Sequence, residues 1–172
     1  MKVLVAYMSQ TGNTKKVAEA IFGEIQGEKE IVNAKEVTSI EGYDLAFLGF
    51  PIHNLGPDTK TKKFLQKHCI DTRQVALFVT HASPEDHEDL PPMLEKFRQA
   101  AAGANIVGMF DCQGELAKAV KFVMSVHPDK KFRTWAKEDE SQGQPDATRL
   151  EKARAFARDT LAKRASGKVT AS

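Results

Sequence analysis

Short apolar runs alternate along the chain with stretches that repeat apolar residues at helical spacing. The apolar runs predict five strands, over residues 2–7, 29–35, 44–50, 74–80 and 104–110. Between them, apolar residues three and four positions apart predict amphipathic helices, over residues 13–26, 58–68 and 89–102. Near-continuous apolar strands separated by helices are typical of an α/β fold with a parallel sheet covered on both faces.

The last third of the chain departs from this alternation. Apolar residues from Leu116 to Met124 again fall at helical spacing, and Pro128 ends the helix that they predict. A polar stretch follows over residues 137–145, before a final helix over residues 146–163. The extra helix and loop have three interpretations: a packing insertion, a cover for a bound ligand, or a contact with a partner.

Length and composition agree with one soluble domain. The chain has 172 residues, of which 41% are hydrophobic and 28% charged. We expect a single domain over residues 1–164 and a flexible tail over residues 165–172. The net charge of +2 is too small to favour nucleic acid as a partner. No apolar run approaches the roughly 20 residues of a membrane helix, so no membrane span is expected.

The two cysteines and the start of the chain indicate a cytoplasmic protein. Met1-Lys2 leads straight into a strand without the apolar region of a signal peptide. Cys69 and Cys112 form no C-x-x-C pair, and no Cys/His cluster has the spacing of a zinc site. No metal is therefore expected.

A hydroxyl-rich turn joins the first strand to the first helix. It consists of Ser9, Gln10, Thr11, Gly12, Asn13 and Thr14. Free backbone N–H groups and the positive end of a helix dipole meet at such a turn, where they bind phosphate. The turn lacks the Gly-Lys-Ser/Thr of a nucleotide triphosphate loop and the G-x-G-x-x-G of a dinucleotide site. It therefore predicts a phosphate monoester, the alternative being an ordinary helix N-cap.

The chain resembles the flavodoxin family in this turn and in two later segments. The run 48–52 ends an apolar strand and opens a loop, and the strand 75–80 is followed by a second loop. The resemblance implies a doubly wound, five-stranded parallel sheet of order 2-1-3-4-5. It also implies that the first turn holds the phosphate of FMN and that the two later loops flank the flavin ring. The ring-flanking residues would be Pro51, Ile52, His53, Asn54, Leu55 and Gly56, with Thr80, His81, Ala82 and Ser83.

The expected topology agrees with this placement. In the order 2-1-3-4-5 the switch point lies between strands one and three, where ligands bind outside the carboxyl ends of the strands. The phosphate turn follows strand one, and the loop from Pro51 follows strand three. Both loops should therefore meet at the same crevice.

Two features set the chain apart from a typical flavodoxin. Neither ring-flanking loop contains the Trp or Tyr with which many flavodoxins cover the flavin. The sequence pI of about 8.5 also contrasts with the acidic surface of most electron-carrying flavodoxins. His53 and His81 have open roles: each would donate to the flavin, stack on it or deliver a proton, or lie exposed in its loop. His68, His87 and His127 are expected at the surface.

Three functions follow from these observations. The first is an FMN-binding electron-transfer flavoprotein that serves a redox partner protein. The second is an FMN-dependent reductase of a small conjugated acceptor such as a quinone, favoured by the missing aromatic cover and the insertion. The third is a phosphate-binding module without flavin, against which the intact turn argues. Fold alone does not decide among them.

Overall fold

A five-stranded parallel sheet forms the centre of the structure, a computed structural model that describes residues 1–166. Its strands are β1 (Val3–Tyr7), β2 (Lys29–Asn33), β3 (Leu45–Pro51), β4 (Gln74–His81) and β5 (Asn105–Gln113). The order is β2-β1-β3-β4-β5, and every ladder is parallel. The expected doubly wound topology is confirmed.

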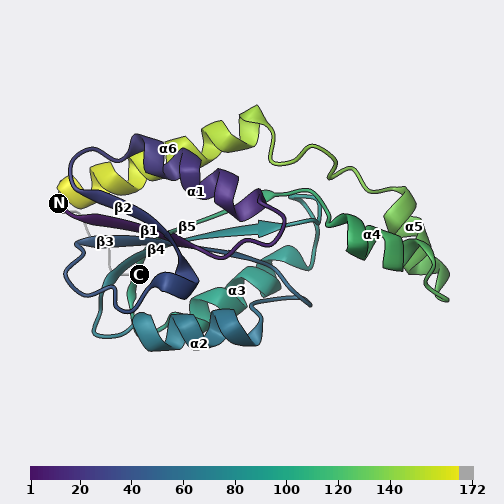
Figure 1. Cartoon of the computed structure of the whole chain (residues 1–172), viewed down its shortest axis with the longest axis horizontal. Helices are drawn as coiled ribbons and strands as arrows, with labels where there is room; N and C mark the ends of the chain where they lie inside the picture. The colour runs from purple at the N-terminus through teal and green to yellow at the C-terminus, as the bar shows by residue number, and fades with distance from the viewer. Residues whose placement is uncertain (167–172) are drawn as a thin grey trace.

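Helices cover both faces of this sheet, as expected (Figure 1). On one face lie α1 (Asn13–Glu24) and α6 (Ala147–Ala165). On the other face lie α2 (Thr59–His68) and α3 (Leu90–Ala100). The short 3-10 helix η1 (Ala34–Glu36) follows β2. Local sequence sets the helix starts: the Asp58 side chain accepts the Thr61 N–H at the start of α2, and prolines occupy the first positions of α3.

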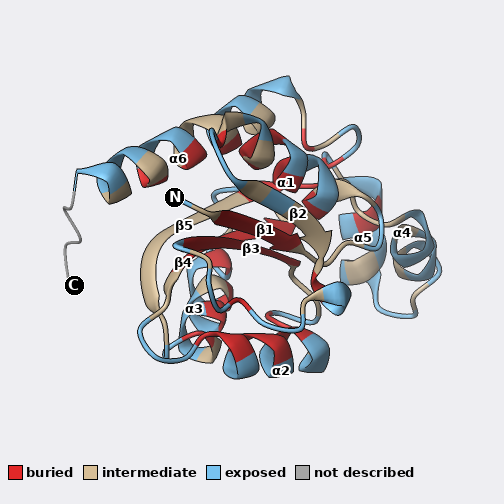
Figure 2. Ribbon diagram, turned by 60° about the vertical axis from the view of Figure 1, so that its left-hand side comes forward, coloured by how far each residue is buried: buried red, intermediate tan, exposed pale blue. Residues whose placement is uncertain are grey.

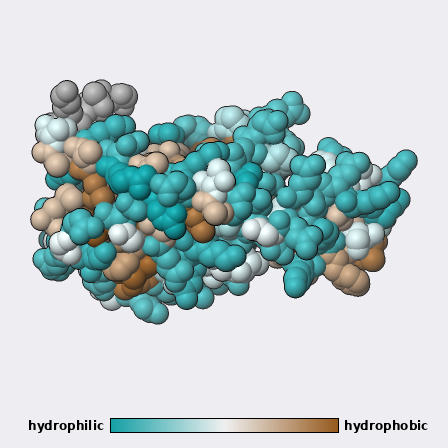
Figure 3. All heavy atoms as spheres, turned by 90° about the horizontal axis from the view of Figure 1, so that it is seen from above, coloured by the Kyte–Doolittle hydropathy of each residue, from teal (hydrophilic) through white to brown (hydrophobic). Residues whose placement is uncertain are grey.

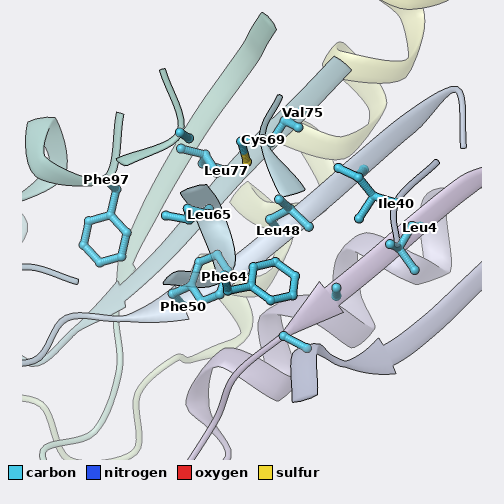
Figure 4. Packing of buried hydrophobic residues seen from close by; sticks show 14 of the residues in the cluster. Leu4, Ile40, Leu48, Phe50, Phe64, Leu65, Cys69, Val75, Leu77 and Phe97 are labelled. Carbon is cyan, nitrogen blue, oxygen red and sulfur yellow. The ribbon is translucent and has the colours of Figure 1, made fainter. Parts of the chain in front are cut away.

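Two apolar cores form, one on each side of the sheet. The first packs α2 and α3 on the sheet, around large buried side chains such as Phe50, Leu65 and Phe97 (Figure 4). The second packs α1 and α6 on the opposite face, around Ile21 and Phe47. The central strands β1 and β3 are buried almost throughout (Figure 2), which explains their continuous apolar sequences.

Two helices project from one end of the molecule (Figure 1). The first, α4 (Lys118–Ser125), was expected, but none of its residues is buried. The second, α5 (Lys130–Lys137), was missed by the sequence analysis. Asp129 caps it by accepting the Lys131 N–H, and Phe132, Trp135 and Ala136 form its apolar face. Its eight residues are few for a period to stand out among lysines and arginines.

The expectation that His68 lies at the surface is wrong. Its side chain is buried, with the ring centroid 4.5 Å from that of Phe64 one turn earlier on the inward face of α2. Burial lowers the pKa of His68 below its ordinary value, because the charged ring would lose its hydration.

At the carboxyl end, α6 extends to Ala165, the first residue of the expected tail. Residues 167–172 of that tail lie outside the described residues. Within residues 1–166 no helix is long and apolar enough to cross a membrane.

Candidate functional site

The turn after β1 is shaped to receive an anion. Gly12 occupies the N-cap of α1 with φ of 93°, a left-handed conformation that favours glycine, and its N–H donates to Ser9 Oγ at 3.0 Å. No side chain of the described chain caps α1, and its first turn holds no acidic residue. The N–H groups of that turn and the positive end of the helix dipole therefore fit a phosphate.

A buried pair of hydroxyls joins this turn to the strand β4. Thr14 Oγ1 lies 2.8 Å from Thr80 Oγ1, and both side chains are almost fully buried. Thr80 also accepts, through its backbone oxygen, the N–H of Ile52 at 2.8 Å. Thr80 therefore ties together all three loops in which the sequence analysis placed the cofactor.

The loop after β3 closes in a tight reverse turn. The His53 N–H donates to the Gly56 backbone oxygen at 2.8 Å, and the Gly56 N–H donates to the His53 backbone oxygen at 3.2 Å. Asn54 and Leu55 between them both have positive φ, 46° and 67°, which makes a type I′ turn. This conformation is unusual for leucine, and Leu55 nevertheless projects its side chain into solvent.

His81 fixes the loop after β4. Its side chain is buried, with Nδ1 2.8 Å from the Ser83 oxygen and Nε2 3.2 Å from Asp111 Oδ2. Nδ1 must donate to the carbonyl oxygen of Ser83. The alternative that His81 is an exposed loop histidine is therefore wrong, whereas His53 is half-buried and its role stays a prediction.

Behind this loop stands a group of polar side chains that the sequence analysis did not select. Gln113 Nε2 donates to the Ala82 oxygen at 3.1 Å, and Arg149 Nη2 donates to Gln113 Oε1 at 3.2 Å. Arg149 also pairs with Glu85, with Nε 2.9 Å from Oε1. The start of α6 thus holds the ring-flanking loop in place, a link between distant segments that sequence spacing does not show.

The turn after β1 also contacts the segment after β5. Asn13 Nδ2 donates to the Glu115 oxygen at 2.8 Å. A Cβ at Gly114 would lie only 2.7 Å from Asn13 Nδ2, so this close approach requires glycine. The predicted site residue Asn13 therefore has a partner within the protein, and Gln10 and Thr11 are the exposed residues of the turn.

A pocket of about 400 Å³ opens beside the ring-flanking loops. Its walls come from the loop after β3, the loop after β4, the end of β5 and the two projecting helices. The lining includes Leu55, Ala82, Ser83, Pro84, Gln113, Met124 and Trp135. Trp135 is the only tryptophan of the chain, and the sequence analysis did not place it at the site. Trp135 lies far in the sequence from both loops, so no local pattern predicted its place at the pocket.

The projecting helices are fastened at their base. The Leu116 N–H donates to Ser141 Oγ at 2.8 Å, and Lys121 Nζ lies 2.8 Å from Asp139 Oδ2. Burial would raise the pKa of Asp139, but hydrogen bonds from Lys121 and Ser141 outweigh it and hold that pKa below its ordinary value. Residues 116–141 are called the α4–α5 lobe below.

Acid should loosen this lobe before the rest of the fold. Because the folded-state pKa of Asp139 is lowered, its stabilising contribution is present at neutral pH and is lost as the pH falls through that pKa. At an acid pH below that pKa, we expect faster amide hydrogen exchange in α4 and α5 than the intrinsic pH dependence predicts, with α1 and α6 unchanged. The variant Asp139→Asn should show the fast exchange already at pH 7. Equal protection of the lobe in both proteins at both pH values would contradict this role of Asp139.

Comparisons with known proteins agree on one family. The flavodoxin domain family matches residues 4–158, so the chain belongs to the flavodoxin family. This is a family of FMN-binding flavoproteins, and the membership confirms FMN as the expected cofactor. The chain is also 33% identical over 174 residues to the flavodoxin-like domain-containing protein BilS of Clostridioides difficile (strain CD3), covering 95% of this chain and 98% of BilS.

Solved structures share the fold at lower identity. Oxidised flavodoxin 2 from Bacillus cereus superposes with a TM-score of 0.60 at 21% identity, over 95% of this chain and 99% of that one. A flavoprotein in complex with FMN from Lactobacillus acidophilus NCFM gives 0.54 at 23% identity, over 64% of this chain and 92% of that one. These likenesses establish the fold and leave the function to be argued from the site.

Proposed function

We propose that this chain is an FMN-binding electron carrier that exchanges electrons with a partner protein. The observation that carries the proposal is that the three loops form one connected site. Thr80 links the proposed phosphate turn to both ring-flanking loops, and residues of these two loops line the pocket. The rim of that pocket includes the exposed side chains of Leu55 and Trp135. FMN supplies one- and two-electron exchange when bound, and a partner would reach its edge at this rim.

The chain's own residues divide the work of binding. The turn from Ser9 to Thr14 would hold the phosphate through backbone N–H groups and hydroxyls. The loops 51–56 and 80–83 would flank the ring, the first shaped by its type I′ turn and the second by His81. Trp135, which lies in the insertion after β5, would supply the aromatic side chain that these loops lack.

A second candidate is an FMN-dependent reductase of a small conjugated acceptor such as a quinone. The pocket favours it, since about 400 Å³ lies within the usual range of small-molecule sites. An acceptor between the ring-flanking loops and Trp135 would lie against the same face that a partner protein would approach.

Turnover with and without a reductase distinguishes the two functions. The pure FMN-loaded protein is mixed with NADH or NADPH and a quinone, and nicotinamide oxidation is followed by absorbance. An electron carrier should turn over only after a flavodoxin reductase is added, because electrons must first pass between proteins. Turnover by the protein alone, at a rate proportional to its concentration, would overturn the carrier proposal in favour of the reductase.

We also propose that the protein works in the cytoplasm. Both cysteines are free and buried, as suits a reducing compartment. Burial raises the pKa of the Cys69 and Cys112 thiols to about 12, so both stay protonated and unreactive at neutral pH.

A further inference from the structure

The α4–α5 lobe carries most of the exposed apolar surface of the protein. Of the eight large apolar side chains exposed in the described part of the chain, five belong to it: Val120, Phe122, Val123, Val126 and Trp135. Phe122 is 68% exposed and Val126 64%. In Figure 3 the projecting lobe shows tan and brown side chains along its lower edge, among mostly hydrophilic neighbours. An apolar cluster of this kind on one small element marks an interaction site.

Basic side chains outnumber acidic ones on the two helices that carry this apolar cluster. The two helices of the lobe, over residues 118–137, contain six lysines and arginines and one acidic residue, Asp129, whereas Glu138, Asp139 and Glu140 follow at the base of the lobe beside the pocket. Lys118, Lys130 and Lys137 are exposed and form no ion pair with any residue from 1 to 166. Lys131 lies over the Trp135 ring, with Nζ 4.7 Å from the ring centroid. A complementary surface would therefore be apolar at its centre and acidic at its edge.

The same lobe forms one wall of the pocket. Met124 from α4 and Trp135 from α5 line it together with Leu55 and Pro84 of the ring-flanking loops. A molecule seated on the apolar cluster would therefore also lie against the site at which electrons leave or enter. This continuity favours a redox protein over a lipid surface, since a bilayer gains nothing from contact with the pocket.

We propose that the α4–α5 lobe is the docking surface for the redox partner, and that the partner presents an apolar patch edged by acidic side chains. The proposal rests on the proposed electron-carrier function and gives that carrier a basic docking surface. Attraction between the lysines and the acidic edge would speed the encounter, and burial of Phe122 and its neighbours would hold the complex.

Two haem proteins of opposite surface charge test the proposal. The FMN-loaded protein is reduced photochemically and mixed in a stopped-flow instrument with ferric cytochrome b5, which is acidic, or ferric cytochrome c, which is basic. Each fully reduced FMN gives one electron to each of two ferric haems, which become ferrous, and returns to the oxidised state by releasing to solvent one proton from the anionic hydroquinone or two from the neutral one. We expect the rate with cytochrome b5 to fall as salt is added, because salt screens attraction between opposite charges.

Two charge-reversal variants locate the surface. Lys118→Glu, Lys130→Glu and Lys137→Glu combined should slow the reaction with cytochrome b5 by at least about tenfold and speed that with cytochrome c. The control combines Lys62→Glu, Lys63→Glu and Lys67→Glu, three exposed lysines of α2 with the same total charge change. This control should have a much smaller effect. Equal slowing by both variants would show that only net charge matters and would overturn the proposal.

Further measurements separate the remaining outcomes. The pair Phe122→Ser and Val126→Ser should slow the reaction with cytochrome b5 while leaving its salt dependence unchanged, and FMN affinity should stay at the wild-type value. Absence of electron transfer from the unaltered protein to either haem protein would refute the carrier function itself. The unaltered protein and the variant of Lys118, Lys130 and Lys137 are also sedimented with phosphatidylglycerol vesicles. Sedimentation of the unaltered protein but not of the variant would assign the surface to lipid and would overturn the proposal.

Discussion

Replacing Thr11 and Thr14 together by alanine is expected to weaken FMN binding by roughly thirtyfold to twenty-thousandfold. Each hydroxyl bonded to a charged phosphate contributes about 1–3 kcal/mol, and about 1.4 kcal/mol corresponds to a tenfold change in affinity. Both residues belong to the turn at the start of α1, where no acidic side chain of the first turn competes for the N–H groups. The measurement is a titration of the apoprotein with FMN.

The two threonines also differ in a way that helps the test. Thr14 is buried and bonded to Thr80, whereas Thr11 is exposed and makes no hydrogen bond to another described residue. Loss of affinity in Thr11→Ala alone therefore reports only the phosphate contact. Thr11→Ser with Thr14→Ser keeps both hydroxyls and should bind nearly as the wild type does. Wild-type affinity in the double alanine variant would refute the assignment of this turn to the phosphate.

The second large effect is expected in the core, on replacing Gly49 by alanine. Gly49 of β3 pairs with Phe78 of β4, and a Cβ at Gly49 would lie 2.0 Å from two carbons of the Phe78 ring. Phe78 is fully buried against the core below α1 and α6, so its ring has no free space to enter. Overpacking of this kind costs about 1–3 kcal/mol or more, which denaturant unfolding of the apoprotein would measure.

Two further variants make this result specific. Gly23→Ala in α1 adds the same methyl group where no neighbouring atom lies within 4 Å, so it should leave stability unchanged or raise it by up to about 1 kcal/mol. Gly49→Ala combined with Phe78→Leu should be more stable than the sum of the two single changes predicts. Strict additivity, or an unchanged unfolding free energy in Gly49→Ala, would contradict the contact between these residues.

Much of the fold was predictable because burial in the core requires a simple pattern of apolar residues along the sequence. A strand covered on both faces must be apolar at nearly every position, as Leu45 to Phe50 are, and a helix on a sheet must be apolar on one side. Five such strands separated by helices leave few topologies, and the resemblance selected the one observed. Helix α5 of the α4–α5 lobe was missed because its eight residues are too few for an apolar period to stand out among lysines and arginines.

The candidate site divides in the same way. The helix start after β1 was predictable from the sequence. Its assignment to a phosphate, which needs a free helix start, small residues and hydroxyls within a few consecutive positions, stays a prediction. The role of His81 was not, because it depends on Asp111, which lies 30 residues away on the neighbouring strand. The same holds for Gln113 and Arg149, which join the end of β5 to the start of α6.

The sequence by itself determined the class of fold and the FMN cofactor of the family, since each is encoded in neighbouring residues or in a regular period of burial. Only the tertiary structure decided how the site is closed: the Thr14–Thr80 link between loops, the fixed ring of His81 and the place of Trp135 at the pocket. These depend on which distant segments meet at one edge of the sheet. Which segments meet is set by the sum of many weak contacts across the chain, so no local sequence pattern predicts it.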